Sequence, residues 1–172
     1  MVTNPSLDLV LEPVLPDLGA PGSEDQPSRP LSSWLTTFHL ASVVLDPYTN
    51  ESSWILQTAA RVLRAFSGSA VRSNFILTCS ADEARAFLGP LNREFLVFAD
   101  PDRSVVRSLG LESLPAFVFI QSDGTVPAVA QGWDPKTWRS VAKEIATTTA
   151  WTAPTIPLAG DPGAFAGTPA LG

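Results

Sequence analysis

Cys79 is the only cysteine in this 172-residue chain, and His39 is the only histidine. A thiolate is a strong nucleophile and redox group, and an imidazole serves as a general base or a metal ligand. A single cysteine cannot form a disulfide within the chain or supply the two or more thiolates of a cysteine-based zinc site. With only one histidine as well, we expect no metal site and no bound cofactor.

Neither residue carries the signature of a catalytic nucleophile and its base. His39 begins a β-rich run, and no G-x-S-x-G turn marks a serine that it would activate. Cys79 ends the apolar run 75–78, and free cysteines are among the most buried residues of proteins. We interpret Cys79 as a structural thiol. Its position just before a helix that begins at Ser80 leaves an exposed, reactive thiol as the alternative.

The charge of the chain argues against nucleic acid and anionic membranes as partners. The net charge is −6, and the 11 basic residues are scattered along the sequence. Nucleic-acid binding depends on clustered Lys and Arg side chains that neutralise phosphates. No apolar run approaches the ~20 residues of a membrane-spanning helix. Residues 1–18 contain prolines but no basic residue, unlike a secretory signal, so we predict a cytoplasmic protein.

Strand and helix signals alternate through residues 32–150, which we predict to form one domain. Apolar positions repeat every three to four residues over 52–66, which indicates a helix with one buried face. Asp123-Gly124 is a strong hairpin signal, and Pro127 restricts the strand after it to a sheet edge. The predicted strands are 39–45, 74–79, 94–99, 116–121 and 126–131, and the predicted helices are 52–66, 81–88, 102–109 and one that begins at Pro135.

This order of elements is βαβαβα followed by ββα. Helices between successive strands require parallel crossovers, with helices on both faces of the sheet. The final hairpin adds antiparallel strands. We therefore predict an α/β fold with three layers and a mixed sheet.

Two proline-rich segments flank the predicted domain. Residues 1–31 combine prolines, glycines and acidic residues, which is typical of an extended or disordered arm. Residues 151–172 form a tail rich in proline and glycine. This tail also contains Trp151, Ile156 and Phe165, which is more apolar than a free linker requires. Whether the tail docks on the domain or stays free is left open.

The stretch from Phe98 to Gly132 resembles the thioredoxin-like superfamily in its redoxin and TlpA-like branch. It contains the acidic turn Asp100-Pro101-Asp102, a helix that ends at Leu109-Gly110, Leu114-Pro115 at the head of a strand, and a turn at Asp123-Gly124. Residues 78–88 are similar to the strand-then-helix insert of the redoxin branch. The resemblance covers residues 36–147. It implies a cis peptide bond at Leu114-Pro115, whose loop would face the active site.

In this superfamily the reactive cysteines lie where the first strand meets the first helix. Here that junction, residues 46–54, contains no cysteine. Ser52 and Ser53 cannot replace a thiolate in disulfide exchange, and no base is placed beside them. We interpret Thr49, Asn50 and Ser52 as helix-capping groups. No catalytic residue is assigned.

The resemblance implies that three loops converge on one binding face. The segment before the cis proline holds an extended peptide backbone in active relatives. The residues expected on this face are Tyr48, Thr49, Asn50, Ser52, Ser53, Leu114, Pro115, Gly132 and Trp133. We expect Trp133 to be partly exposed beside Pro115. Trp54 either lines the same face or turns inward onto the sheet.

The sequence thus predicts a non-catalytic thioredoxin-like protein that binds a protein, a peptide or a small ligand through this face. One alternative is a thiol oxidoreductase or antioxidant protein that uses Cys79 with an external partner, or a glutathione-linked activity. Another is a structural subunit that binds partners through residues 1–31 and 151–172. A protein or peptide is the expected partner, nucleic acid and membrane are not, and the oligomeric state is left open.

Overall fold

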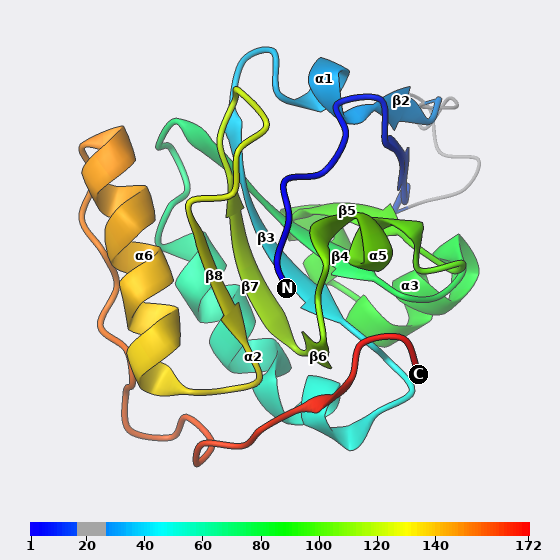
Figure 1. The fold of residues 1–172 in the computed structure, drawn as a ribbon. Helices are drawn as coiled ribbons and strands as arrows, with labels where there is room; N and C mark the ends of the chain where they lie inside the picture. Colours follow the sequence, from blue (N-terminus) through cyan, green and yellow to red (C-terminus); the bar gives the residue numbers. More distant parts are fainter. Residues whose placement is uncertain (17–26) are drawn as a thin grey trace.

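Apolar runs of the sequence form the parallel centre of a mixed sheet (Figure 1). The computed structural model describes residues 1–16 and 27–172. In it, β4 (Val71–Leu77) lies between β3 (His39–Leu45) and β5 (Leu96–Ala99), and both neighbours run parallel to it. Strands that are covered on both faces need apolar side chains on both, which is why these runs are nearly continuous.

A hairpin extends the sheet beyond β3. β7 (Ala116–Ile120) pairs antiparallel with β3, and β8 (Ala128–Gln131) pairs antiparallel with β7. β8 is an edge strand, as Pro127 predicts. The mixed α/β sheet predicted from the order of elements is therefore confirmed.

The N-terminal segment adds two strands at the opposite side of the sheet. β1 (Val10–Pro13) pairs antiparallel with β5, and β2 (Arg29–Pro30) pairs with β1, which gives the order β2-β1-β5-β4-β3-β7-β8. Where it is described, the arm predicted over 1–31 is extended and packs on the domain. Burial of apolar side chains such as Leu11 outweighs the proline content. Residues 17–26 of this arm lie outside the described part.

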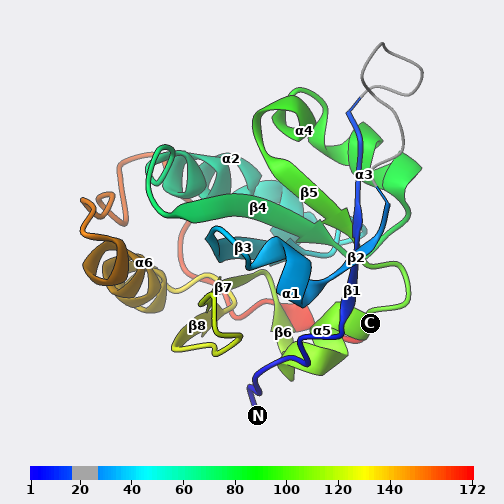
Figure 2. The same ribbon diagram turned by 90° about the horizontal axis from the view of Figure 1, so that it is seen from above.

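Helices cover both faces of the sheet and complete three layers (Figure 2). α2 (Asn50–Arg64) and α6 (Pro135–Thr149) lie on one face. α1 (Leu31–Trp34) and α5 (Ser104–Leu109) lie on the other. In the described residues, no helix combines the length and apolarity needed to cross a bilayer.

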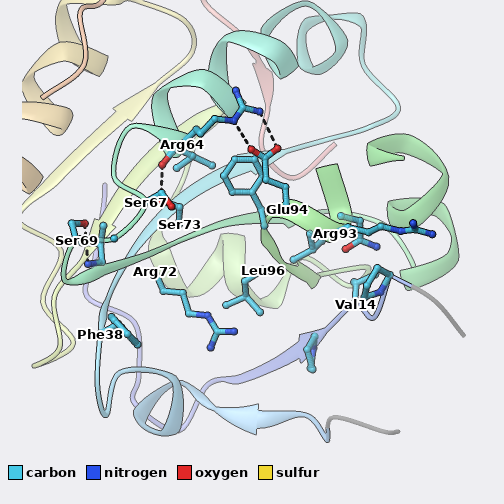
Figure 3. Close-up of a pocket in the computed structure, with 18 of the residues that line it drawn as sticks. Val14, Phe38, Arg64, Ser67, Ser69, Arg72, Ser73, Arg93, Glu94 and Leu96 are labelled. Atoms are coloured by element: carbon cyan, nitrogen blue, oxygen red, sulfur yellow. Dashed lines mark hydrogen bonds and ion pairs between the residues drawn. The ribbon is translucent and has the colours of Figure 1, made fainter. Parts of the chain in front are cut away.

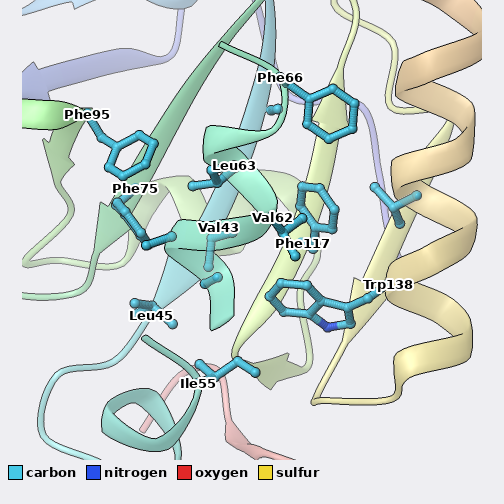
Figure 4. Close-up of a cluster of buried hydrophobic side chains, with 14 of the residues drawn as sticks. Val43, Leu45, Ile55, Val62, Leu63, Phe66, Phe75, Phe95, Phe117 and Trp138 are labelled. Carbon is cyan, nitrogen blue, oxygen red and sulfur yellow. The ribbon is translucent and has the colours of Figure 1, made fainter. Parts of the chain in front are cut away.

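The two sides of the sheet contribute to separate hydrophobic clusters, because successive strand residues point to opposite faces. Along β3, Val43 and Leu45 pack with α2 and α6, whereas Val44 packs with α1 and α5. In the first cluster the rings of Phe117 and Trp138 have centroids 5.0 Å apart (Figure 4). This packing makes the sheet a rigid support for the loops at its ends.

The connection between β4 and β5 contains two short helices. α3 (Ala81–Leu88) begins with the predicted capping box: the Ser80 hydroxyl accepts a hydrogen bond from the Glu83 N–H and donates one to the Glu83 carboxylate. α4 (Leu91–Glu94) was not predicted from the sequence. Its four residues lie in a segment without a helical period, which explains why the pattern misses it.

The C-terminal tail returns to the domain. β6 (Ser113–Leu114) and β9 (Thr168–Pro169) form a separate two-stranded antiparallel sheet. Before β9, the tail follows α6 and then crosses the lower end of the molecule in Figure 1, where β3 leads into α2. Residues 151–172 are therefore docked, which settles the question that their composition leaves open.

Candidate functional site

The junction between β3 and α2 contains a network of hydroxyl groups. The Ser52 hydroxyl is fully buried and accepts a hydrogen bond from the Asp46 N–H at 3.0 Å. The Thr49 hydroxyl donates to the Asp46 carbonyl oxygen at 2.8 Å and lies 3.2 Å from Ser52 Oγ. Asn50 and Ser53 are exposed. The hydroxyls of Thr49 and Ser52 thus brace the turn itself, which corrects their predicted role as caps of the helix backbone.

His39 lies at the far end of β3 from this junction. Leu45, at the other end of the strand, is six positions further along the chain, which corresponds to about 20 Å. Its Nδ1 accepts a hydrogen bond from the Ser122 N–H at 2.9 Å. His39 is therefore not a base for Ser52 or Ser53. Within residues 1–16 and 27–172, no three His, Cys, Asp or Glu side chains gather as a metal site would require.

A largely buried ion pair links the junction to the N-terminal end of α5 and to the tail. Asp46 is 4% exposed, and its carboxylate accepts hydrogen bonds from the Tyr48 N–H at 3.0 Å and from Arg103 at 2.9 Å. Arg103 also donates to the Ala170 carbonyl oxygen at 2.5 Å. Sequence reasoning missed this pair, because Asp46 and Arg103 are 57 positions apart and no local pattern joins them.

Cys79 lies next to this network but is not activated by it. Its side chain is 2% exposed. Burial, together with the negative charges of Glu83 and Asp46, raises the pKa of the thiol to about 12. Tyr48 donates its hydroxyl hydrogen to the carboxylate of Glu83 in α3, so the Tyr48 side chain is turned toward that helix. A neutral, buried thiol is the structural interpretation of Cys79, as the sequence favoured.

The loop of the predicted binding face is formed by Leu114 and Pro115. The peptide bond between them is cis, and both residues are buried. The Pro115 carbonyl oxygen accepts a hydrogen bond from the Gly132 N–H at 2.7 Å. β6, which ends at Leu114, pairs with Thr168 and its neighbour in β9. An extended segment is thus bound at the edge where the resemblance predicts a peptide.

Gly132 and Trp133 lie beneath the C-terminal tail, just before its strand β9. The Trp133 backbone exchanges two hydrogen bonds of 2.9 Å with Phe165, and its indole N–H donates to the Pro162 carbonyl oxygen at 2.7 Å. Trp133 is fully buried, so the expectation that it is partly exposed beside Pro115 was wrong. The tail covers it, and the strand-and-helix pattern of the domain gave no indication of that contact.

Trp54 completes the contact between α2 and the tail. Its side chain is 57% exposed and does not turn inward onto the sheet. The Trp54 and Phe165 rings meet edge to face, with centroids 5.7 Å apart. The structure therefore brings the cis-proline loop, Gly132 and Trp133 together under the tail, and it adds Trp54 and Arg103 to the candidate site.

A cavity of about 670 Å³ lies away from this face (Figure 3). It is lined by residues 13–16, the end of α2, the start of β4 and the segment from Asn92 to Val97. Arg64 and Glu94 form an ion pair at its edge. None of the residues predicted for the binding face lines it, so this cavity is separate from the candidate site.

Comparison with solved structures identifies the fold. MTB dsbF superimposes with a TM-score of 0.62 and 16% identity over 83% of this chain and 96% of that chain. Xanthomonas campestris peroxiredoxin Q gives a TM-score of 0.61 and 11% identity over 86% and 93%. The chain has the thioredoxin-like fold. A secreted Mycobacterium tuberculosis disulfide oxidoreductase is similar too, with a TM-score of 0.58 and 17% identity over 82% and 96%.

No protein-family model matches the sequence, and no curated protein matches it significantly. The structural neighbours include redoxins, in agreement with the resemblance seen in the sequence. At identities of 11–17% this similarity shows the thioredoxin-like fold alone. What the chain does must be argued from its own residues.

Proposed function

We propose that the chain is a non-catalytic thioredoxin-like protein that binds an extended segment of a protein or peptide at the cis-proline edge. The observation that carries this proposal is the pairing of β6 with β9, in which this edge already holds an extended backbone. Adding a strand to an exposed edge is a common way of recognising peptides. The pairing of backbone groups favours a peptide over a small ligand.

Two observations support the non-catalytic part of the proposal. The β3–α2 junction has Ser52 and Ser53 in the region where a thiolate would be needed, and neither hydroxyl has a base in the described structure. The remaining thiol, Cys79, is buried and protonated at neutral pH. The alternative of a thiol oxidoreductase or antioxidant protein that uses Cys79 receives no support from this geometry.

The purified protein should not reduce the disulfides of insulin faster than dithiothreitol alone. Dithiol exchange needs a second thiol to release the mixed disulfide, and the chain has only one. Turbidity of the insulin solution measures the reaction. A thioredoxin with two active-site cysteines, assayed in parallel, shows that the assay works, and acceleration by this protein would contradict the proposal.

Binding at the cis-proline edge should be blocked in the Gly132→Glu variant. A Cβ at Gly132 would lie 2.5 Å from the Ala166 carbonyl oxygen, and its nearest neighbours all belong to the bound segment. A side chain there therefore obstructs an extended ligand without entering the core. Peptides of about ten residues, selected from a random library on the wild-type protein, should lose about tenfold or more in affinity, as measured by fluorescence anisotropy.

Gly89→Glu is the matched control for this variant. Gly89 also has a positive φ, and a Cβ there would meet no atom within 4 Å. Both variants introduce the same charge and a similar backbone strain, but only one lies under the bound segment. Equal affinity of the selected peptides for both variants would show that they bind elsewhere.

The identity of the partner and its location in the cell are further parts of the proposal. A protein or peptide partner fits the backbone pairing, and a net charge of −6 does not favour nucleic acid. We propose a cytoplasmic location, which fractionation of cells that produce the chain would test.

A further inference from the structure

Residues 163–172 of the chain lie on the face that the proposed function requires for binding. We propose that this segment is a tethered copy of the ligand: it has the features of the peptide that the face recognises, and it competes with that peptide. This inference rests on the proposed function and adds to it a ligand class and a means of control.

The segment is held mainly through its backbone. Phe165 exchanges two 2.9 Å hydrogen bonds with Trp133, and the Ala170 N–H donates to the Glu112 carbonyl oxygen at 2.9 Å. Between these points β9 pairs with β6. An incoming peptide in extended conformation has the same donors and acceptors at the same spacing, so it can replace each of these bonds.

Three side-chain positions of the segment set the ligand class. Phe165 packs edge to face on Trp54. A Cβ at Gly167 would lie 2.6 Å from the Leu114 carbonyl oxygen, so this position accepts only glycine. Ala170 is 1% exposed, and its site fits a small side chain. The recognised peptide therefore has an aromatic residue, a glycine two positions later and a small apolar residue three positions after that.

The segment is attached to the domain by a separate anchor. The Ile156 side chain is 2% exposed, and the Asp161 carboxylate pairs with Arg61 at 2.7 Å. After this anchor comes Gly163, where a Cβ would meet nothing within 4 Å. Beyond it, Ala170 is the only residue of the segment that is buried. Residues 163–172 can thus leave the face while residues 151–162 stay in place.

The tether determines how strongly the segment competes. A short flexible connection gives a local concentration of roughly 1 mM, so a free peptide must overcome a competitor present at that level. If the segment and a free peptide each bind the face with a dissociation constant of about 10 μM, the tethered segment would weaken the apparent binding of the peptide about a hundredfold. A partner that resembles the segment poorly therefore cannot displace it, whereas a partner that makes additional contacts with the protein can.

Fluorescence anisotropy with a labelled peptide of residues 163–172 tests this inference on the full-length protein. The Gly167→Ala variant should release the segment, and Gly163→Ala is the matched control because its added methyl group meets open space. We expect the peptide to bind Gly167→Ala about tenfold or more tightly than it binds the wild type or Gly163→Ala. Placing alanine at Phe165 of the peptide should remove most of that affinity.

Hydrogen exchange at Phe165 and Ala170 reports release of the segment, and thermal unfolding reports the fold. If Gly167→Ala does not fold, the Phe165→Ala protein serves the same test. The inference would be overturned if the amides of the segment stayed protected in the released variant. It would also be overturned if the peptide bound the wild type, Gly167→Ala and Gly163→Ala with equal affinity. If unrelated library peptides bind the released protein and the peptide of residues 163–172 does not, the inference is wrong and the proposed function stands. If neither binds, the proposed function fails as well.

Discussion

The Cys79 thiol should react with iodoacetamide about a thousandfold more slowly in the folded protein than in the unfolded chain at pH 8. The thiolate is the reactive form, and burial raises the pKa of this thiol from 9.0 to about 12. At pH 8 this shift lowers the thiolate fraction from about one tenth to about one ten-thousandth. Mass spectrometry of the alkylated chain over time gives both rates.

The dependence of this reaction on pH provides a second check. Below the pKa, the reactive fraction rises tenfold for each pH unit, so the folded protein should still gain reactivity above pH 9. In guanidinium chloride, the rate should level off above that pH. A folded-state rate within tenfold of the unfolded rate would revive the alternative in which Cys79 is a working redox thiol.

The Arg103→Met variant should lose about 3 kcal/mol of stability, which is a large part of what a domain of this size has. The substitution leaves the Asp46 carboxylate, whose side chain is 6% exposed, without its cation. It also removes the donor to the Ala170 carbonyl oxygen. The free energy of unfolding in urea measures the loss.

Arg107→Met is the control for this prediction. Arg107 is an exposed residue of α5, the helix that follows Arg103, so its replacement should change stability by about 0.5 kcal/mol or less. Adding Asp46→Asn to Arg103→Met should restore part of the stability, because the uncompensated charge is then gone. Similar losses for the two single variants would mean that the ion pair does not stabilise the junction.

The central elements of the fold could be predicted because their signals are local. The strand 39–45 coincides with β3, and the capping box at Ser80 begins α3 as expected. The start of α5 was predicted two residues too early: the Asp100 carboxylate accepts hydrogen bonds from Val105 and Val106 N–H across a longer loop. β1 was missed because its pairing with β5 depends on a contact distant in sequence.

The candidate site was predictable only within residues 36–147, which the resemblance to the thioredoxin-like superfamily covers. It placed Leu114-Pro115 and Gly132 on one edge, and the structure brings them together. It gave no indication that residues 163–172 occupy this edge, since the tail lies outside the aligned region. The burial of Trp133 follows from that contact and could not be read from local sequence.

The route of the tail also matters for the order of events during translation. Asp161 pairs with a residue 100 positions earlier, and Ala170 with one 67 positions earlier. Every strand of the main sheet precedes residue 132, and domains fold as the chain emerges from the ribosome. The sheet and its cis-proline edge can thus form before residues 163–172 leave the ribosome. A nascent chain presents an open face, so a partner that meets it co-translationally does not have to displace the tail.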